Sequence, residues 1–250
     1  MKALVTGGSR SIGAGIARKL AADGHEVVIG FSGSERGRSA AEKLIAEIEA
    51  AGGKAWAVGS DISTLEGVQA LYDGAVEHLG HIDILVNNAG IDGNKLFLDN
   101  DEEEWDRLID TDLRPVYRMS RLVVPGMLER RFGRIISVAS ICGMTGYNWP
   151  RKTAYGAVKA GVIGFTKCLA VEMAPYGITV NAVSPGPIAT DMNAGYITNE
   201  EGFRKFLEGI PVRHMGSPKD IANAVAYLAS PEQDYITGQV ISPNGGMLMA

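Results

Sequence analysis

The chain of 250 residues carries 24 Lys and Arg against 29 Asp and Glu, a formal net charge of −5, and 46% of its residues are hydrophobic. These values are typical of a globular protein with a sizeable core, and they disfavour nucleic acid and anionic membranes as partners. The two cysteines, Cys142 and Cys168, are far apart in the sequence, so we expect neither a metal site nor a disulfide framework. Because the apolar runs are too short for a membrane span or a signal segment, we expect a cytoplasmic protein.

Short β-branched runs alternate with longer stretches of helical periodicity. The predicted strands are Ala3–Val5, Glu26–Phe31, Ala55–Gly59, Ile82–Val86, Arg134–Val138, Ile178–Val183 and Gln239–Ile241. The predicted helices are Ile12–Asp23, Ser39–Ala51, Leu65–Leu79, Glu102–Arg130, Tyr155–Ala174 and Lys219–Ala229. Since the strands are almost continuously apolar, the pattern predicts an α/β fold: a Rossmann-type doubly wound parallel sheet of about seven strands with helices on both faces. No linker or repeat divides residues 1–250, so we expect one domain, with an irregular insertion at 189–215.

A glycine-rich loop, TGGSRSIG at residues 6–13, joins the first predicted strand to the first predicted helix. Backbone N–H groups at a helix N-terminus bind phosphate, helped by the helix dipole, and glycines let the backbone approach it closely. The loop fits neither G-x-G-x-x-G nor the P-loop pattern, in which Lys rather than Ala14 would follow Gly13. Taken alone it indicates either a nucleotide site or a tight turn.

Polar segments follow three later strands, namely Asn87–Gly90, Ser137–Ser140 and Asn181–Thr190. Asparagine amides at a strand end need partners, so they bridge neighbouring strand ends or contact a ligand. Ligands of open α/β sheets bind outside the carboxyl ends of the strands, and all three segments fall at that edge. Their joint occurrence favours a ligand site there.

Tyr155 and Lys159 are four residues apart near the start of a predicted helix. That spacing places the phenol and the ammonium on the same helix face. An ammonium beside a phenol favours the phenolate and lowers a pKa that is ordinarily about 10. The pair can therefore donate or accept a proton near neutral pH, although such a spacing also arises by chance.

In order and spacing, these motifs resemble the short-chain dehydrogenase/reductase superfamily in its compact form, over essentially the whole chain. The motifs that carry the resemblance are the glycine loop, Asp61-Ile62, Asn87–Gly90, Ser140, Tyr155-x-x-x-Lys159, Pro185-Gly186, Tyr235–Gln239 and Asn244–Gly246. Against the family's T-G-x-x-x-G-x-G pattern, Ser11 stands at the middle glycine. We expect Ser11 to have φ below zero and its hydroxyl to cap the helix that follows.

The resemblance implies interconversion of a carbonyl and an alcohol with a nicotinamide dinucleotide. Tyr155 would be the general acid or base, Ser140 would bind the substrate oxygen, and Lys159 would hold the nicotinamide ribose and lower the pKa of Tyr155. The implied cofactor-binding set is Gly7, Gly8, Ser9, Arg10, Ile12, Gly13, Ser32, Asp61, Ile62, Asn88, Ala89, Gly90, Tyr155, Lys159, Pro185, Gly186, Ile188 and Thr190.

The family usually has asparagine where this chain has Asp112, behind the lysine, where it supports a water of the proton relay. An ionised Asp112 accepts hydrogen bonds but donates none. Its charge is expected to stabilise the Lys159 ammonium and to oppose formation of the Tyr155 phenolate, so we predict a working relay with altered pH dependence. The alternative is that Asp112 is a solvated helix residue.

The predicted cofactor is NADP, with NAD as the alternative. An acidic residue at the end of the second strand would bind the ribose 2′-hydroxyl of NAD, but no acid follows that strand until Glu35. Ser32 together with Arg10 offers a site for a 2′-phosphate. Arg38 is more simply an ordinary surface charge.

The family members most similar in pattern are the 3-oxoacyl-acyl-carrier-protein reductases, which dock their acidic carrier with two arginines. Arg131 matches one of these positions, but Tyr176 stands at the other, which leaves the carrier in doubt. The predicted substrate is a 3-oxoacyl thioester or another ketone or secondary alcohol, with the segments 147–151 and 189–215 lining or covering it. A dinucleotide-binding sensor or scaffold without turnover is the remote alternative. The family commonly forms homotetramers, so we expect a homo-oligomer.

Overall fold

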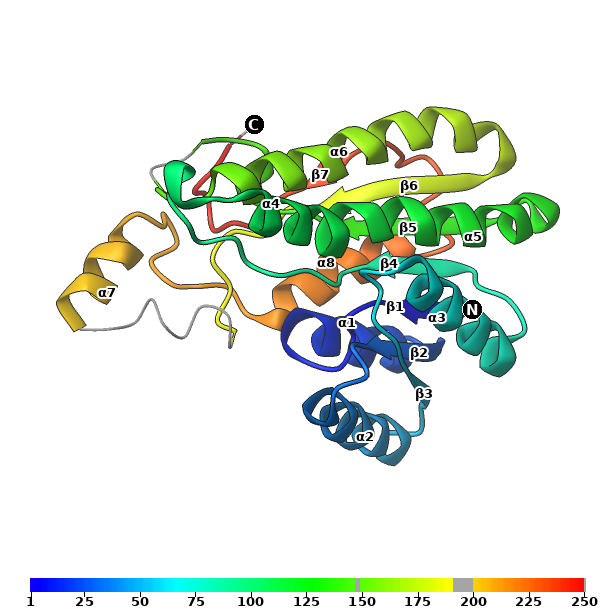
Figure 1. The fold of residues 1–250 in the computed structure, drawn as a ribbon. Coiled ribbons are helices and arrows are strands. Elements are labelled where there is room, and N and C mark those ends of the chain that lie inside the picture. The colour runs from blue at the N-terminus through cyan, green and yellow to red at the C-terminus, as the bar shows by residue number, and fades with distance from the viewer. Residues whose placement is uncertain (147–148, 191–199, 250) are drawn as a thin grey trace.

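The computed structural model describes residues 1–146, 149–190 and 200–249, and within them a parallel sheet has the strand order β3-β2-β1-β4-β5-β6-β7 (Figure 1). The strands are β1 (Lys2–Val5), β2 (Glu26–Phe31), β3 (Lys54–Gly59), β4 (Ile84–Asn87), β5 (Gly133–Val138), β6 (Ile178–Val183) and β7 (Val240–Ile241). The order reverses between β1 and β4, which pair in register from Ala3 opposite Ile84 to Val5 opposite Val86. This reversal is where doubly wound sheets bind ligands, and the predicted fold class is confirmed.

Helices cover both faces of the sheet because successive strand residues point to opposite sides. The helices are α1 (Ser11–Ala22), α2 (Glu35–Ala50), α3 (Leu65–Leu79), α4 (Glu102–Leu108), α5 (Arg114–Arg130), α6 (Thr153–Met173), α7 (Glu200–Glu208) and α8 (Pro218–Ala229). Ala3 and Val5 pack with α1, α2 and α8 in one core, whereas Leu4 packs with α3, α5 and α6 in the other. No helix in the described ranges is both long and apolar enough to cross a membrane.

Three predicted elements differ clearly from the observed ones. The helix predicted over Ser39–Ala51 is α2, which already begins at Glu35 with Ser34 as its N-cap. The predicted helix Glu102–Arg130 is interrupted by the π-helical turn η2 (Ile109–Leu113), which separates α4 from α5. Hydrophobic periodicity runs across both helices and does not reveal such a turn, although π turns are frequent at functional sites. The predicted irregular insertion 189–215 contains the helix α7, which was not predicted from the sequence. Residues 191–199 of the insertion lie outside the described ranges.

Candidate active site

A cavity of about 1090 Å³ opens at the carboxyl ends of the strands. Its walls include nearly all of the site residues predicted from the sequence, namely Gly7, Ser9, Arg10, Ile12, Gly13, Ser32, Asp61, Ile62, Asn88, Ala89, Gly90, Asp112, Ser140, Tyr155, Lys159, Pro185, Gly186, Ile188 and Thr190. The exception is Gly8, which does not line the cavity. Its N–H donates to the Gly30 carbonyl oxygen at 2.8 Å, so Gly8 holds the loop against β2.

The glycine loop turns tightly into α1. Ser11 has a φ of +50°, and the N-cap of α1 is Arg10, with no side-chain capping bond. The expectation of a negative φ and a capping hydroxyl at Ser11 was therefore wrong: the residue adopts the left-handed conformation that a glycine takes most easily. The first turn of α1 carries no acidic side chain, so its N-terminus suits an anion.

The loop packs closely against the end of β4. A Cβ on Gly7 would lie 2.8 Å from the Ala89 Cα, and one on Gly13 would lie 2.2 Å from the Gly7 carbonyl oxygen. The Asn88 side-chain amide donates to the carbonyl oxygens of Thr6 at 3.0 Å and of Gly7 at 3.1 Å. Asn88 thus bridges the ends of β1 and β4, as one of the two alternatives for this segment predicted, and the glycines keep the loop narrow enough for this contact.

Asp112 and Lys159 form a buried ion pair beside the cavity. The Lys159 Nζ lies 3.0 Å from the Asp112 Oδ2, and the two side chains are 5% and 0% exposed. Lys159 also donates to the Val138 carbonyl oxygen at 3.3 Å, and the Ile91 N–H donates to the Asp112 Oδ1 at 2.8 Å. The alternative of a solvated Asp112 is wrong: its carboxylate joins α6 to the segment after β4, and Lys159 in turn bonds to the end of β5.

Tyr155 is half-buried, with its ring centroid 5.6 Å from the Lys159 Nζ. Burial raises the pKa of Tyr155; the Lys159 ammonium lowers it, and the Asp112 carboxylate raises it, with the net shift upward. Burial by itself lowers the pKa of Lys159, but Asp112 and then Tyr155 raise it above its ordinary value. Lys159 thus lowers the pKa of Tyr155, as expected, but burial of the phenol raises it by more. The spacing of the two residues in the sequence does not reveal this cost of burying a phenolate.

Ser140 also lines the cavity, and it follows β5 by two residues. It is 9% exposed, and its Oγ accepts a hydrogen bond from the Cys142 N–H at 3.2 Å, which starts the turn η3 (Ile141–Gly143). The lining of the cavity therefore includes a serine hydroxyl, a phenol and an ammonium. That set can hydrogen-bond and protonate an oxygen atom of a substrate.

The end of β2 presents hydroxyl groups and cations to the cavity. Arg10, Ser32 and Arg36 line it, and the Ser32 Oγ lies 3.2 Å from the Ser34 Oγ. Glu35 does not line the cavity; its side chain is 90% exposed and lies 3.9 Å from Arg38, its partner on α2. Arg38 is thus a surface charge, as expected, whereas Arg36 also faces the cavity.

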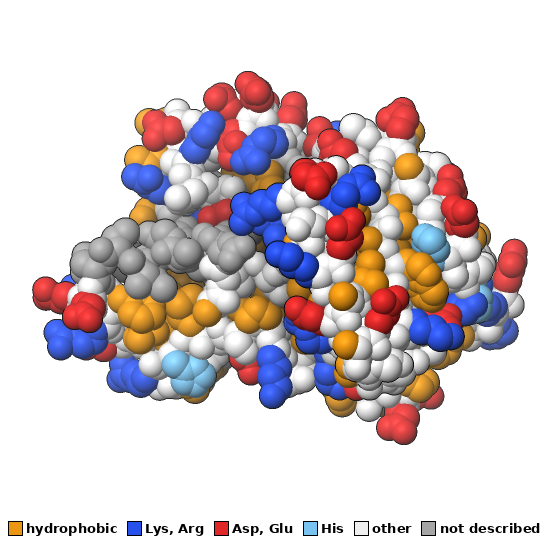
Figure 2. Space-filling model, turned by 90° about the horizontal axis from the view of Figure 1, so that it is seen from below, with side chains coloured by type: hydrophobic (Ala, Val, Ile, Leu, Met, Phe, Trp, Pro, Cys, Tyr) orange, Lys and Arg blue, Asp and Glu red, His pale blue; other side chains and the backbone are white. Residues whose placement is uncertain are grey.

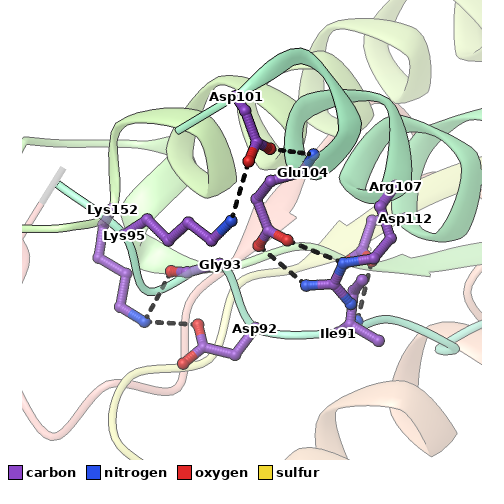
Figure 3. Close-up of polar contacts among 9 residues, drawn as sticks. All are labelled: Ile91, Asp92, Gly93, Lys95, Asp101, Glu104, Arg107, Asp112 and Lys152. Carbon is purple, nitrogen blue, oxygen red and sulfur yellow. Dashed lines mark hydrogen bonds and ion pairs between the residues drawn. The ribbon is translucent and has the colours of Figure 1, made fainter. Parts of the chain in front are cut away.

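The cavity residues that were not predicted from the sequence include Asp92, Asn94, Cys142 and Lys152, whereas Phe203 and Phe206 belong to the segment 189–215 that was predicted to line or cover the substrate. Lys152 precedes Tyr155 by three residues, a helical spacing that could have indicated it. Its ion pair with Asp92, 60 residues away (Figure 3), has no signal in a single sequence. Of the predicted mouth loop, Trp149 lines the cavity, and Tyr147 lies outside the described residues.

Part of the cavity lining is apolar. Figure 2 shows acidic and basic side chains interspersed over one face, with one group of hydrophobic side chains at the end that carries α7 and another over the opposite half. From that helix Phe203 and Phe206 line the cavity, together with Met215. These side chains suit an apolar portion of a ligand rather than a nucleic acid.

Comparison with known proteins places this geometry in a family. Residues 7–248 match the family described as Enoyl-(Acyl carrier protein) reductase. The chain is 44% identical to a 3-oxoacyl-acyl-carrier-protein reductase of Staphylococcus epidermidis, covering 99% of this chain and 98% of that one. It is also 44% identical to the enzyme of that name from Vibrio harveyi, covering 99% and 97%.

Comparison with solved structures supports the same family. A candidate gluconate dehydrogenase from Agrobacterium tumefaciens superposes with a TM-score of 0.92 at 31% identity, covering 100% of this chain and 96% of that chain. A candidate short-chain alcohol dehydrogenase from Sinorhizobium meliloti gives 0.91 at 35% identity, covering 98% and 95%. The chain belongs to the short-chain dehydrogenase/reductase family, whose members are oxidoreductases of CH–OH and keto groups that use a nicotinamide dinucleotide.

Proposed function

We propose that the protein is an NADP(H)-dependent oxidoreductase that interconverts a ketone and a secondary alcohol, with 3-oxoacyl thioesters as its substrate class. The observation that carries this proposal is that Ser140, Tyr155 and the buried Lys159–Asp112 pair line one cavity. A buried ion pair behind a phenol in a cavity is typical of a catalytic site, which favours turnover over a sensor.

The residues of the cavity fit a dinucleotide. The uncapped N-terminus of α1 and the glycine loop would hold its pyrophosphate, and a Cβ at Gly7 or Gly13 would disrupt that loop. Ser32 and Arg10 would bind the 2′-phosphate, and Lys159 the nicotinamide ribose. When bound, the nicotinamide supplies or accepts the hydride.

Tyr155 would act as the general acid in reduction. Its raised pKa keeps the phenol protonated at neutral pH, so it donates its proton to the carbonyl oxygen as negative charge develops there. Ser140 donates a hydrogen bond to the same oxygen. In the reverse direction, Tyr155 must first lose its proton, and the high pKa makes alcohol oxidation an alkaline reaction.

Asp112 would hold Lys159 in place and charged. The carboxylate accepts the Ile91 N–H and pairs with the ammonium, so the lysine stays in its ionised form beside the phenol. An ammonium fixed in this way stabilises the phenolate that forms during the reaction.

A 3-oxoacyl thioester is favoured because the relatives at 43–44% identity are reductases of that name. Arg131 supports an acidic carrier, but its guanidinium lies 6.0 Å from the ring of Tyr176 and donates to the Pro175 carbonyl oxygen at 3.0 Å. With a tyrosine in place of a second arginine, a ketone or thioester that is free of the carrier protein is the second candidate.

We also propose a cytoplasmic homotetramer. Its contacts would form through α5, α6 and the C-terminal segment. Tyr117 on α5 is 49% exposed and Val171 on α6 is 77% exposed, so both helices present apolar surface that a second copy would bury. Sedimentation of the purified protein tests this assembly.

The experiment that tests the function is a substrate panel followed by nucleotide absorbance. The panel contains 3-oxoacyl thioesters on carrier protein, coenzyme A and pantetheine, cyclic ketones and 2-enoyl thioesters, each with NADPH and with NADH. We expect reduction of the 3-oxoacyl thioesters with at least a tenfold NADPH preference in kcat/KM. Reduction of enoyl thioesters alone, or nucleotide binding with no turnover, would overturn the proposal.

A further inference from the structure

The segment from Gly90 to Gly93, directly after β4, forms the wall that faces the catalytic cluster. A Cβ on Gly90 would lie 2.5 Å from the Asp112 Oδ2, and one on Gly93 would lie 3.2 Å from the Tyr155 Cβ. Backbone at these two positions therefore touches both the buried carboxylate and the tyrosine. Any displacement of the segment changes the surroundings of the phenol.

An ion pair fixes the far end of this segment. The Lys152 Nζ lies 2.5 Å from the Asp92 Oδ1 and donates to the Gly93 carbonyl oxygen at 3.2 Å (Figure 3). The Lys152 and Asp92 side chains are only 16% and 21% exposed, so solvent screens the pair less than it does a surface pair. Lys152 is also the N-cap residue of α6, the helix that carries Tyr155.

Lys152 is as close to the tyrosine ring as Lys159 is. The Lys152 Nζ lies 5.5 Å from the ring centroid, and the Lys159 Nζ lies 5.6 Å from it. Each ammonium has its own carboxylate partner, Asp92 for the first and Asp112 for the second. The titratable and charged groups around the phenol are Lys152, Lys159, Asp92, Asp112 and Cys142.

We propose that the Asp92–Lys152 pair is a second positioning element of the active site, which holds the segment 90–93 against Tyr155 and balances the charge beside the phenol. The inference rests on the proposed role of Tyr155 and adds Asp92 and Lys152 as positioning residues. Because the two carry opposite charges at one place, removing either changes the net charge beside the phenol, and the two changes have opposite sign. The two removals must then act on the phenol in opposite directions.

The direct test titrates Tyr155 in the protein alone, by NMR of ¹³C-labelled tyrosine, with its signal identified by its absence in Tyr155→Phe. Asp92→Asn removes a negative charge near the phenol, so the titration moves to lower pH; Lys152→Met removes a positive charge, so the titration moves to higher pH. We expect shifts of about half a pH unit or more each. If the titration of Tyr155 is incomplete at the highest pH at which the protein stays folded, the pH values at which titration begins in the wild type and the two variants are compared instead.

Lys95→Met is the matched control, because Lys95 belongs to the same loop but pairs with Asp101 at 3.6 Å in a more exposed position and does not line the cavity. Lys95→Met should leave the Tyr155 titration unchanged. Lys152→Arg, which keeps the positive charge, should titrate like the wild type rather than like Lys152→Met. Shifts in the same direction, or none in either variant, would overturn the inference.

Turnover measurements separate this inference from the proposed function. Asp92→Asn and Lys152→Met should each lower kcat about three- to tenfold and change KM for the nucleotide less. If the wild type reduces ketones and Tyr155→Phe does not, while the titrations stay unmoved, only the inference fails. If the titrations move in opposite directions but the wild type reduces nothing, only the proposed function fails.

Discussion

The Oδ2 of Asp112 lies 3.0 Å from the Nζ of Lys159, and both side chains are withdrawn from solvent. A buried ammonium and a buried carboxylate each cost free energy, which their attraction offsets only when the geometry is good. Here the carboxylate also accepts the Ile91 N–H at 2.8 Å. The pair therefore fixes a positive charge beside Tyr155 while adding a negative charge that opposes its ionisation.

Replacing Asp112 by asparagine should shift the pH dependence of alcohol oxidation. The Asp112 carboxylate raises the pKa of Tyr155, so its removal lowers that pKa and moves the alkaline rise in kcat/KM to lower pH, by about one unit. The measurement is a pH-rate profile of both proteins. Asp110→Asn is the control, since Asp110 lies in the same turn but pairs with Arg114; an unchanged profile for Asp112→Asn would refute the role given to this charge.

Stability should fall at alkaline pH for a related reason. The folded protein raises the pKa of Lys159 above its ordinary value of 10.5, because Asp112 and Tyr155 outweigh burial. A raised pKa contributes stability that is complete below the unfolded value and is lost as pH rises through the folded value. Urea unfolding from about pH 8 upwards should show the loss beginning near pH 10.5 in the wild type. The double variant Asp112→Leu/Lys159→Met should show a smaller loss; an equal loss would contradict this explanation.

Cofactor preference should depend on Arg10 and Ser32. Arg10→Ala should raise KM for NADPH about tenfold and leave KM for NADH nearly unchanged, because only NADPH carries the 2′-phosphate. Ser32→Asp should reverse the preference by repelling that phosphate. Arg38→Ala is the control, because Arg38 pairs with Glu35 and does not line the cavity. Equal effects of Arg10→Ala on the two nucleotides would rule out this site.

The glycine loop should not tolerate a side chain at Gly13. A Cβ there would lie 2.2 Å from the Gly7 carbonyl oxygen and 2.6 Å from the Asn88 Nδ2. Gly13→Ala should lower the free energy of unfolding by about 1–3 kcal/mol and weaken nucleotide binding. In Gly126→Ala, inside α5, the Cβ would meet only the flexible Arg130 guanidinium, at 3.1 Å, so nucleotide binding should stay close to the wild type and the free energy of unfolding should not fall. Urea unfolding measures the free energy of unfolding, and nucleotide titration measures the binding.

Much of the site could be predicted because it depends on local patterns. The four-residue spacing of Tyr155 and Lys159 places them on one helix face, and polar segments after apolar strands indicate the edge of the sheet. The sequence does not reveal what depends on burial and distant contacts. Ser11 takes a left-handed φ because the turn requires it, and Asp92 meets Lys152 only after folding.

The raised pKa of Tyr155 is another example. The sequence indicated that Lys159 would lower it, but burial of the phenol is the larger effect. Burial of Tyr155 depends on residues far away in the sequence, including Gly93 and Leu108 of α4, and no short motif contains them.

The most direct test of the account is the effect of Tyr155→Phe on the reduction of a 3-oxoacyl thioester by NADPH. If the phenol supplies the proton, kcat should fall at least about 100-fold. KM for NADPH should change little more than twofold, because the substitution removes one hydroxyl group from the cavity. Tyr227→Phe, at a position that is 48% exposed on α8, should leave the rate unchanged. A Tyr155→Phe enzyme that keeps the wild-type kcat would contradict the account.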